Sequence, residues 1–96
     1  MITHVVMWRL EDPTPERLER FTGLLRSLQG NVPSLLEIEV GLNWLDDGDA
    51  HDVVLVTRFA SRADADAYRV HPFHQEVAGQ LKAMTAARSV VDFGDG

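Results

Sequence analysis

The sequence predicts an α+β domain whose elements follow one another in the order strand, helix, strand, strand, helix, strand. Four segments have the alternating or continuous apolar pattern of strands, and two segments between them have apolar residues at helical spacing. That order is the ferredoxin-like βαββαβ arrangement, a four-stranded antiparallel sheet with helices on one face. The length of 96 residues suits a single domain over residues 1–96, in which residues 94–96 are expected to form a frayed tail.

The first strand is expected from Ile2 to Leu10, and both of its faces are apolar. One face carries Ile2, His4, Val6, Trp8 and Leu10, and the other carries Val5 and Met7. The pattern leaves open whether His4 lies beneath the helices or on the opposite face. A helix follows over residues 15–28, because Thr14 is a suitable N-cap, Pro15 a favoured first helical residue and Gly30 a C-terminal stop. Its apolar residues recur at helical spacing: Leu18, Phe21, Leu25 and Leu28.

The remaining elements are predicted from the same kinds of pattern. Strands are expected over residues 36–43 and 52–59, joined by an acidic turn. A helix over residues 62–69 begins after Ser61, and Pro72 interrupts it because the residue before a proline disfavours the helical conformation. A further helix begins at Pro72, and the last strand is expected over residues 89–93.

The predicted helices cover one face of the sheet, yet the first and third strands are apolar on both faces. An open sheet with a bare apolar face is prone to aggregate. We therefore expect a homodimer in which two copies pack through this sheet face.

Composition excludes several classes of function. The chain has no cysteine, which removes disulfides, zinc–thiolate sites and a cysteine nucleophile. A net charge of −6 argues against nucleic acid or anionic membrane as a partner. The sequence lacks a membrane-spanning apolar run and a signal-peptide pattern, so a cytoplasmic location is expected. Lys82 is the single lysine among nine basic residues, an arginine bias typical of a GC-rich bacterium.

The densest group of chemically capable side chains lies around the predicted helix break. It contains Tyr68, His71 and His74 on either side of Pro72. A neutral histidine is a competent general base near pH 7, and a tyrosine hydroxyl can orient a carbonyl oxygen. The same residues could instead be structural, with His71 capping the helix that starts at Pro72 and Tyr68 packing at the sheet edge. His4 could line the same cavity as His74 or lie in the dimer interface.

Metal and cofactor sites are not expected. Pro72 disrupts the helical spacing between His71 and His74, and the acidic residues 46–52 lack the calcium-loop spacing. The sequence has neither a glycine-rich phosphate loop nor the surroundings of a nucleophilic serine.

Several stretches together form a wider pattern. They are residues 2–10, 33–43 and 52–59, the element Tyr68-x-x-His71-Pro72-x-His74, and residues 90–93. This pattern covers the chain from Met1 to about Phe93 and resembles the stress-responsive α/β-barrel domain family, often called Dabb. The resemblance implies a dimeric α+β barrel of two ferredoxin-like protomers with stacked sheets, working without metal or cofactor.

One plant branch of that family closes polyketides by an aldol condensation, and the resemblance maps its catalytic pair to Tyr68 and His74. His4 matches a histidine that lines the same pocket, and His71 and Trp8 are further candidates for substrate binding. The aromatic lining of the plant pocket is not reproduced, since Leu25 and Leu28 face inward here.

Three hypotheses remain open at this stage, and whether the chain is an enzyme is undecided. The first is a cyclase or isomerase that uses His/Tyr acid–base chemistry on a small, largely apolar carbonyl compound. The second is a non-catalytic stress-responsive dimeric domain or ligand carrier. The third is a cofactor-free monooxygenase-like enzyme, which would need Trp8 or Trp44 near its substrate.

Overall fold

A computed structural model of the protein describes residues 1–95, and Gly96 of the expected tail lies outside the described residues. The elements in order are β1 (Ile2–Leu10), α1 (Pro15–Arg26), β2 (Glu37–Leu42), β3 (Val53–Phe59), α2 (Arg62–Val70), α3 (Pro72–Lys82) and β4 (Thr85–Gly94). The predicted order of elements is confirmed, and the second helical segment is divided in two at Pro72.

Two elements have a boundary that differs from the expected one by two residues or more. α1 ends at Arg26, two residues before Leu28, where the chain enters a turn. β4 begins at Thr85 instead of residue 89, and it includes Gly94, which was expected in the tail. Residues 85–88 lack a strand-like apolar pattern, but Thr85 lies opposite Leu10 at the end of β1. Backbone pairing with β1 therefore extends β4 beyond what side-chain propensity indicates.

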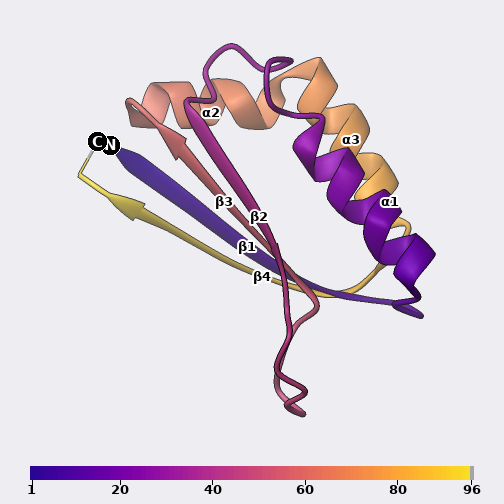
Figure 1. The fold of residues 1–96 in the computed structure, drawn as a ribbon. Helices are drawn as coiled ribbons and strands as arrows, with labels where there is room; N and C mark the ends of the chain where they lie inside the picture. Colours follow the sequence, from indigo (N-terminus) through magenta and orange to yellow (C-terminus); the bar gives the residue numbers. More distant parts are fainter. Residues whose placement is uncertain (96) are drawn as a thin grey trace.

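The strands form one antiparallel sheet in the order β2-β3-β1-β4. β1 is paired on both sides, and the helices lie against one face of the sheet (Figure 1). This is the ferredoxin-like α+β architecture that the sequence predicts. A side chain at the centre of β1 thus has neighbours from β3 and from β4 as well as from the helices above it.

Aromatic contacts hold the helices to the sheet. The ring of Phe21 in α1 is fully buried and meets the Trp8 ring of β1 edge-on, with centroids 5.2 Å apart. At the other end of the core, Phe59 of β3 packs against Tyr68 of α2 with centroids 4.9 Å apart. The first contact ties α1 to β1 and the second ties α2 to β3, which helps to determine where the α2 side chains lie.

His4 lies on the face of β1 that the helices cover. Five alternate residues of β1 are each at most 8% exposed: Ile2, His4, Val6, Trp8 and Leu10. The register places His4 opposite Thr57 of β3 and Asp92 of β4. The question that the sequence left open is therefore answered, since His4 faces the helices and not the bare side of the sheet.

The opposite face of the sheet is apolar at its centre and uncovered in the single chain. β4 adds to this face, because Val91 is 58% and Phe93 56% exposed. The side chains that share it alternate with the core residues of their strands: Val5, Met7, Val54, Val56, Val91 and Phe93. The prediction that β1 and β3 have two apolar faces is confirmed.

Two kinds of feature are absent from residues 1–95. In this described part of the chain, no helix has the length and hydropathy needed to cross a membrane. No group of three or more histidine, aspartate or glutamate side chains in the same residues is placed to hold a metal ion.

Candidate active site

The break between α2 and α3 consists of a single residue. α2 ends at Val70, α3 begins at Pro72, and His71 between them is extended, with φ −62° and ψ 134°. Pro72 disfavours the helical conformation at the residue before it, so α2 stops there. The Nδ1 atom of His71 accepts a hydrogen bond from the backbone N–H of Phe73 at 3.1 Å. His71 therefore caps α3.

The break also determines the position of His74. A helix that ends leaves its last carbonyl groups without partners within the helix. The Nδ1 atom of His74 lies 3.1 Å from the carbonyl oxygen of Arg69, and Gln75 donates to the same oxygen at 3.2 Å. A carbonyl oxygen only accepts, so Nδ1 of His74 carries the hydrogen. In the neutral ring this leaves Nε2 with a free lone pair.

The surroundings of His74 keep its imidazole neutral. Burial lowers the pKa of His74 below its ordinary value of 6.5, because desolvation disfavours the charged ring. The hydrogen bond to the Arg69 carbonyl opposes this shift, whereas the charges of His4, Arg88 and His71 add to it. A neutral imidazole at pH 7 is able to accept a proton.

Tyr68 is the buried polar group at the centre of the site. Its side chain is 1% exposed, and its hydroxyl has no hydrogen-bond partner among residues 1–95. Its ring lies 4.3 Å from the ring of His74 and 6.3 Å from that of His4, centroid to centroid. Burial raises the pKa of Tyr68, so the group stays a phenol that can donate a hydrogen bond.

His4 is held by a carboxylate from the neighbouring strand. Its Nδ1 atom lies 2.5 Å from Oδ1 of Asp92, its partner in the β1–β4 register. The His4 side chain is buried, and that of Asp92 is half exposed. A carboxylate that accepts from Nδ1 fixes the orientation of the ring and leaves Nε2 free to face a ligand.

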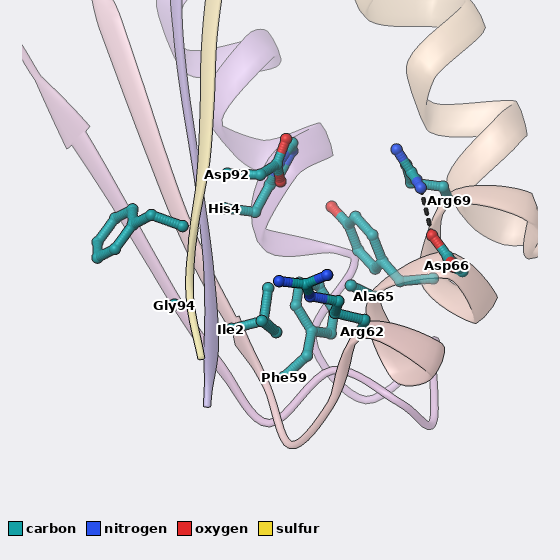
Figure 2. A pocket seen from close by; sticks show the side chains of 11 residues that line it. Ile2, His4, Phe59, Arg62, Ala65, Asp66, Arg69, Asp92 and Gly94 are labelled. Carbon is teal, nitrogen blue, oxygen red and sulfur yellow. Dashed lines mark hydrogen bonds and ion pairs between the residues drawn. The ribbon is translucent and has the colours of Figure 1, made fainter. Parts of the chain in front are cut away.

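Tyr68 and His4 line two cavities. The inner cavity, of about 170 Å³, lies between the helices and the sheet, and His74 also lines it. Its apolar walls include Trp8, Leu25 and Leu81. The outer cavity, of about 300 Å³, lies near the start of α2 and the end of β4 (Figure 2). Both cavities thus contain one unpaired phenol and one carboxylate-bound imidazole.

Four of the five residues that the sequence singled out meet at the inner cavity. They are His4, Trp8, Tyr68 and His74. The fifth, His71, lines neither cavity, because its ring turns to the α3 backbone as a cap. The structure therefore gives His71 the structural role that the sequence had kept as an alternative to substrate binding.

Asp92 was not among the candidates drawn from the sequence. It is the one acidic residue of β4, and only the β1–β4 register brings it opposite His4. Its place directly after the apolar pair Val90 and Val91 was the one available signal.

The two histidines that flank Pro72 are expected to be opposite neutral tautomers. Nδ1 of His71 accepts a hydrogen bond and so lacks a hydrogen, whereas Nδ1 of His74 donates one. Nitrogen-15 chemical shifts of the imidazole rings, recorded above pH 7, should show Nε2–H for His71 and Nδ1–H for His74. Each ring serves as the control for the other, and the same tautomer at both positions would contradict the assigned contacts.

Comparison with known proteins agrees with this geometry. Residues 2–95 match the family described as Stress responsive A/B Barrel Domain (Dabb). No curated protein sequence matches the chain. The chain is similar to a dimeric ferredoxin-like protein of unknown function from Thermobifida fusca YX, with 25% identity, a TM-score of 0.86, and coverage of 98% of this chain and 90% of that one.

Two enzymes have a similar fold. A hydroxynitrile lyase from Passiflora edulis is 18% identical with a TM-score of 0.85, covering 96% of this chain and 90% of that one. An antibiotic biosynthesis monooxygenase is 17% identical with a TM-score of 0.72, covering 100% of this chain and 99% of that one. At these identities the likeness shows the fold alone. The match over residues 2–95 shows more: the chain belongs to the stress-responsive α/β-barrel (Dabb) domain family.

Proposed function

We propose that the protein binds a small, largely apolar carbonyl compound in the inner cavity and moves a proton on it without a cofactor. The observation that carries this proposal is the buried Tyr68 hydroxyl, which has no partner within residues 1–95 and lies beside a neutral His74. An unpaired buried hydroxyl costs about 1–3 kcal/mol. A ligand oxygen would supply the acceptor that this hydroxyl lacks.

The proposed reaction uses these two side chains in sequence. Nε2 of His74 removes a proton from the carbon next to the substrate carbonyl. The Tyr68 hydroxyl donates a hydrogen bond to the carbonyl oxygen as negative charge develops there. His74 then returns the proton to another carbon, which completes an isomerisation, or to the alkoxide formed by ring closure. Asp92 holds His4 so that its free Nε2 can position the substrate.

The size and lining of the inner cavity favour a small substrate. An apolar cavity of about 150 Å³ is large enough to hold benzene. The inner cavity, of about 170 Å³, therefore suits a single ring or a short chain rather than a long linear polyketide. Side chains do not fill the whole space between the helices and the sheet, which supports a ligand-binding role.

A non-catalytic ligand carrier is the second candidate, and a specific observation favours it. His71 and His74 both make hydrogen bonds that stabilise the α2–α3 break, so each has a structural use. The monooxygenase alternative has less support, because Trp44 is 89% exposed and lines neither cavity. Trp8 does line the inner cavity. A cytoplasmic location in a bacterium stays a prediction from composition.

The role of His74 is testable by hydrogen–deuterium exchange at the carbon next to the carbonyl of cyclohexanone in deuterium oxide. We expect the wild-type protein to catalyse this exchange and His74→Ala to slow it by about 10²–10⁴-fold. His51→Ala is the matched control, because His51 lies outside both cavities. The melting temperature of His74→Ala should stay close to that of the wild type. A large loss of stability with unchanged exchange would favour the structural role instead.

The pH dependence of the exchange rate should follow the titration of His74. The neutral form of His74 is the base, and its pKa lies below 6.5. We therefore expect kcat/KM to rise with pH to a plateau, with a midpoint below 6.5. The free energy of unfolding should change with pH in the same direction. The pKa of His74 is depressed in the folded state, so it contributes stability above pH 6.5 that is lost as the pH falls through that pKa. A midpoint above 6.5 would contradict the assignment of His74 as the base.

Tyr68→Phe separates activity from stability. Removing a buried hydroxyl that has no partner should leave the free energy of unfolding unchanged or raise it by up to about 1 kcal/mol. Exchange should fall by about 10²–10³-fold, because the developing oxyanion loses its hydrogen-bond donor. Urea unfolding and the exchange assay measure the two effects on the same sample. A clear destabilisation would mean that the hydroxyl has a partner in the folded protein.

We also propose that two copies of the chain pack through the bare sheet face. The similar protein from Thermobifida fusca is dimeric, and the uncovered centre of this sheet is apolar. We expect Val5→Arg, which places a charge at the middle of this face, to produce a monomer in size-exclusion chromatography with light scattering. Val70→Arg is the control, since Val70 is 70% exposed at the end of α2 on the helical side. Dimers of Val5→Arg would show that the interface lies elsewhere.

A further inference from the structure

The outer cavity has a feature that the proposed chemistry does not use. It lies between α2 and the strands, and Ile2 and Phe59 form part of an apolar floor. Its rim carries two arginines, Arg62 and Arg69. His4 and Tyr68 form its wall on the side of the inner cavity. A cavity with an apolar floor and cationic groups at its rim is suited to an amphipathic ligand.

One charged side chain at this cavity has no ion-pair partner within residues 1–95. Asp66 forms an ion pair with Arg69, and Asp92 is hydrogen-bonded to His4. Arg62 has no ion pair and no side-chain hydrogen bond within residues 1–95. Figure 2 shows the pair between Asp66 and Arg69, and it shows the Arg62 side chain reaching from the start of α2 into the space beside Ile2. Of the four Arg and Asp side chains that line this cavity, Arg62 is therefore the one without a partner among residues 1–95.

The position of Arg62 adds to the positive potential at this end of the cavity. It is the first residue of α2, directly after the N-cap Ser61. The N-terminus of a helix carries a partial positive charge, so a cation there is unfavourable and an anion is favoured. The site thus combines an unpaired guanidinium with a helix end of the same sign.

The Tyr68 hydroxyl supplies a second indication, which this site shares with the inner cavity. It is a buried donor without an acceptor among residues 1–95, and its side chain lines the outer cavity as well as the inner one. A ligand with one anionic group would pair with Arg62. Another oxygen of the same ligand would accept a hydrogen bond from the Tyr68 phenol. The guanidinium fork matches the two oxygens of a carboxylate.

We propose that the outer cavity binds a small amphipathic carboxylate, whose acid group contacts Arg62 and whose apolar body lies against Ile2 and Phe59. A single guanidinium without a partner among residues 1–95 suits one carboxylate group. This site goes beyond the proposed function, because it concerns the second cavity and requires no reaction.

The test compares phenylacetate with its neutral isostere phenylacetamide, by following backbone amide chemical shifts during titration of the full-length protein. We expect the wild type to bind the acid at least about tenfold more tightly than the amide, as is typical of hydrogen bonds to charged groups. The shifts should centre on Ala65 and Gly94, which line the outer cavity. Arg62→Gln should abolish the preference for the acid, and Arg62→Lys should keep part of it.

Arg20→Gln is the matched control. It also removes one positive charge, but Arg20 is an exposed residue of α1 that lines neither cavity. We expect it to keep the wild-type preference. Equal binding of acid and amide, no binding of either, an equal loss in Arg20→Gln, or shifts confined to the inner cavity would each overturn the proposal. The readout involves no reaction, so failure here and failure of cyclohexanone exchange are separate outcomes.

Discussion

The one-residue break before Pro72 is the constraint on which the site depends. Proline has no backbone N–H and excludes the helical conformation from His71, so α2 cannot run into α3. The carbonyl of Arg69 is then available to the His74 ring. That contact sets which nitrogen of His74 is free and holds the ring against Tyr68. An unbroken helix would have used the same carbonyl for its own ladder.

The residues of the candidate site stabilise the fold less than the residues around them do. A buried phenol without a partner among residues 1–95 opposes folding, and an imidazole whose pKa is depressed by burial opposes it below pH 6.5, where the unfolded chain binds the proton more tightly. The aromatic core around Phe21 and Trp8 contains no such groups. Polar groups that stay unpaired inside a well-packed domain are typical of functional sites, where a ligand completes the contacts. The distribution of stabilising and destabilising groups therefore agrees with a binding site at Tyr68.

Periodicity, together with the proline at position 72, was enough to predict the order of elements, the helix break and the two apolar faces of β1. It could not place His4, because an apolar pattern on both faces does not say which face the helices cover. It missed residues 85–88 of β4, whose strand conformation comes from pairing with β1. It also missed Asp92 and Arg62. The role of Asp92 depends on a neighbour that is distant in sequence, and the role of Arg62 depends on the cavity that it lines. Such relations depend on register and packing, which local patterns do not contain.

The central position of β1 has a consequence for how the protein reaches its native state. His4 and Asp92 are 88 residues apart in sequence, yet they are paired neighbours in the sheet. Contacts between distant parts of a chain form slowly, because the intervening loop must first be closed at an entropic cost. During synthesis, β1 therefore remains without one of its two partners until β4 has been made. The histidine of the site acquires its carboxylate only at that late stage, so an incompletely synthesised chain lacks the arrangement of the site.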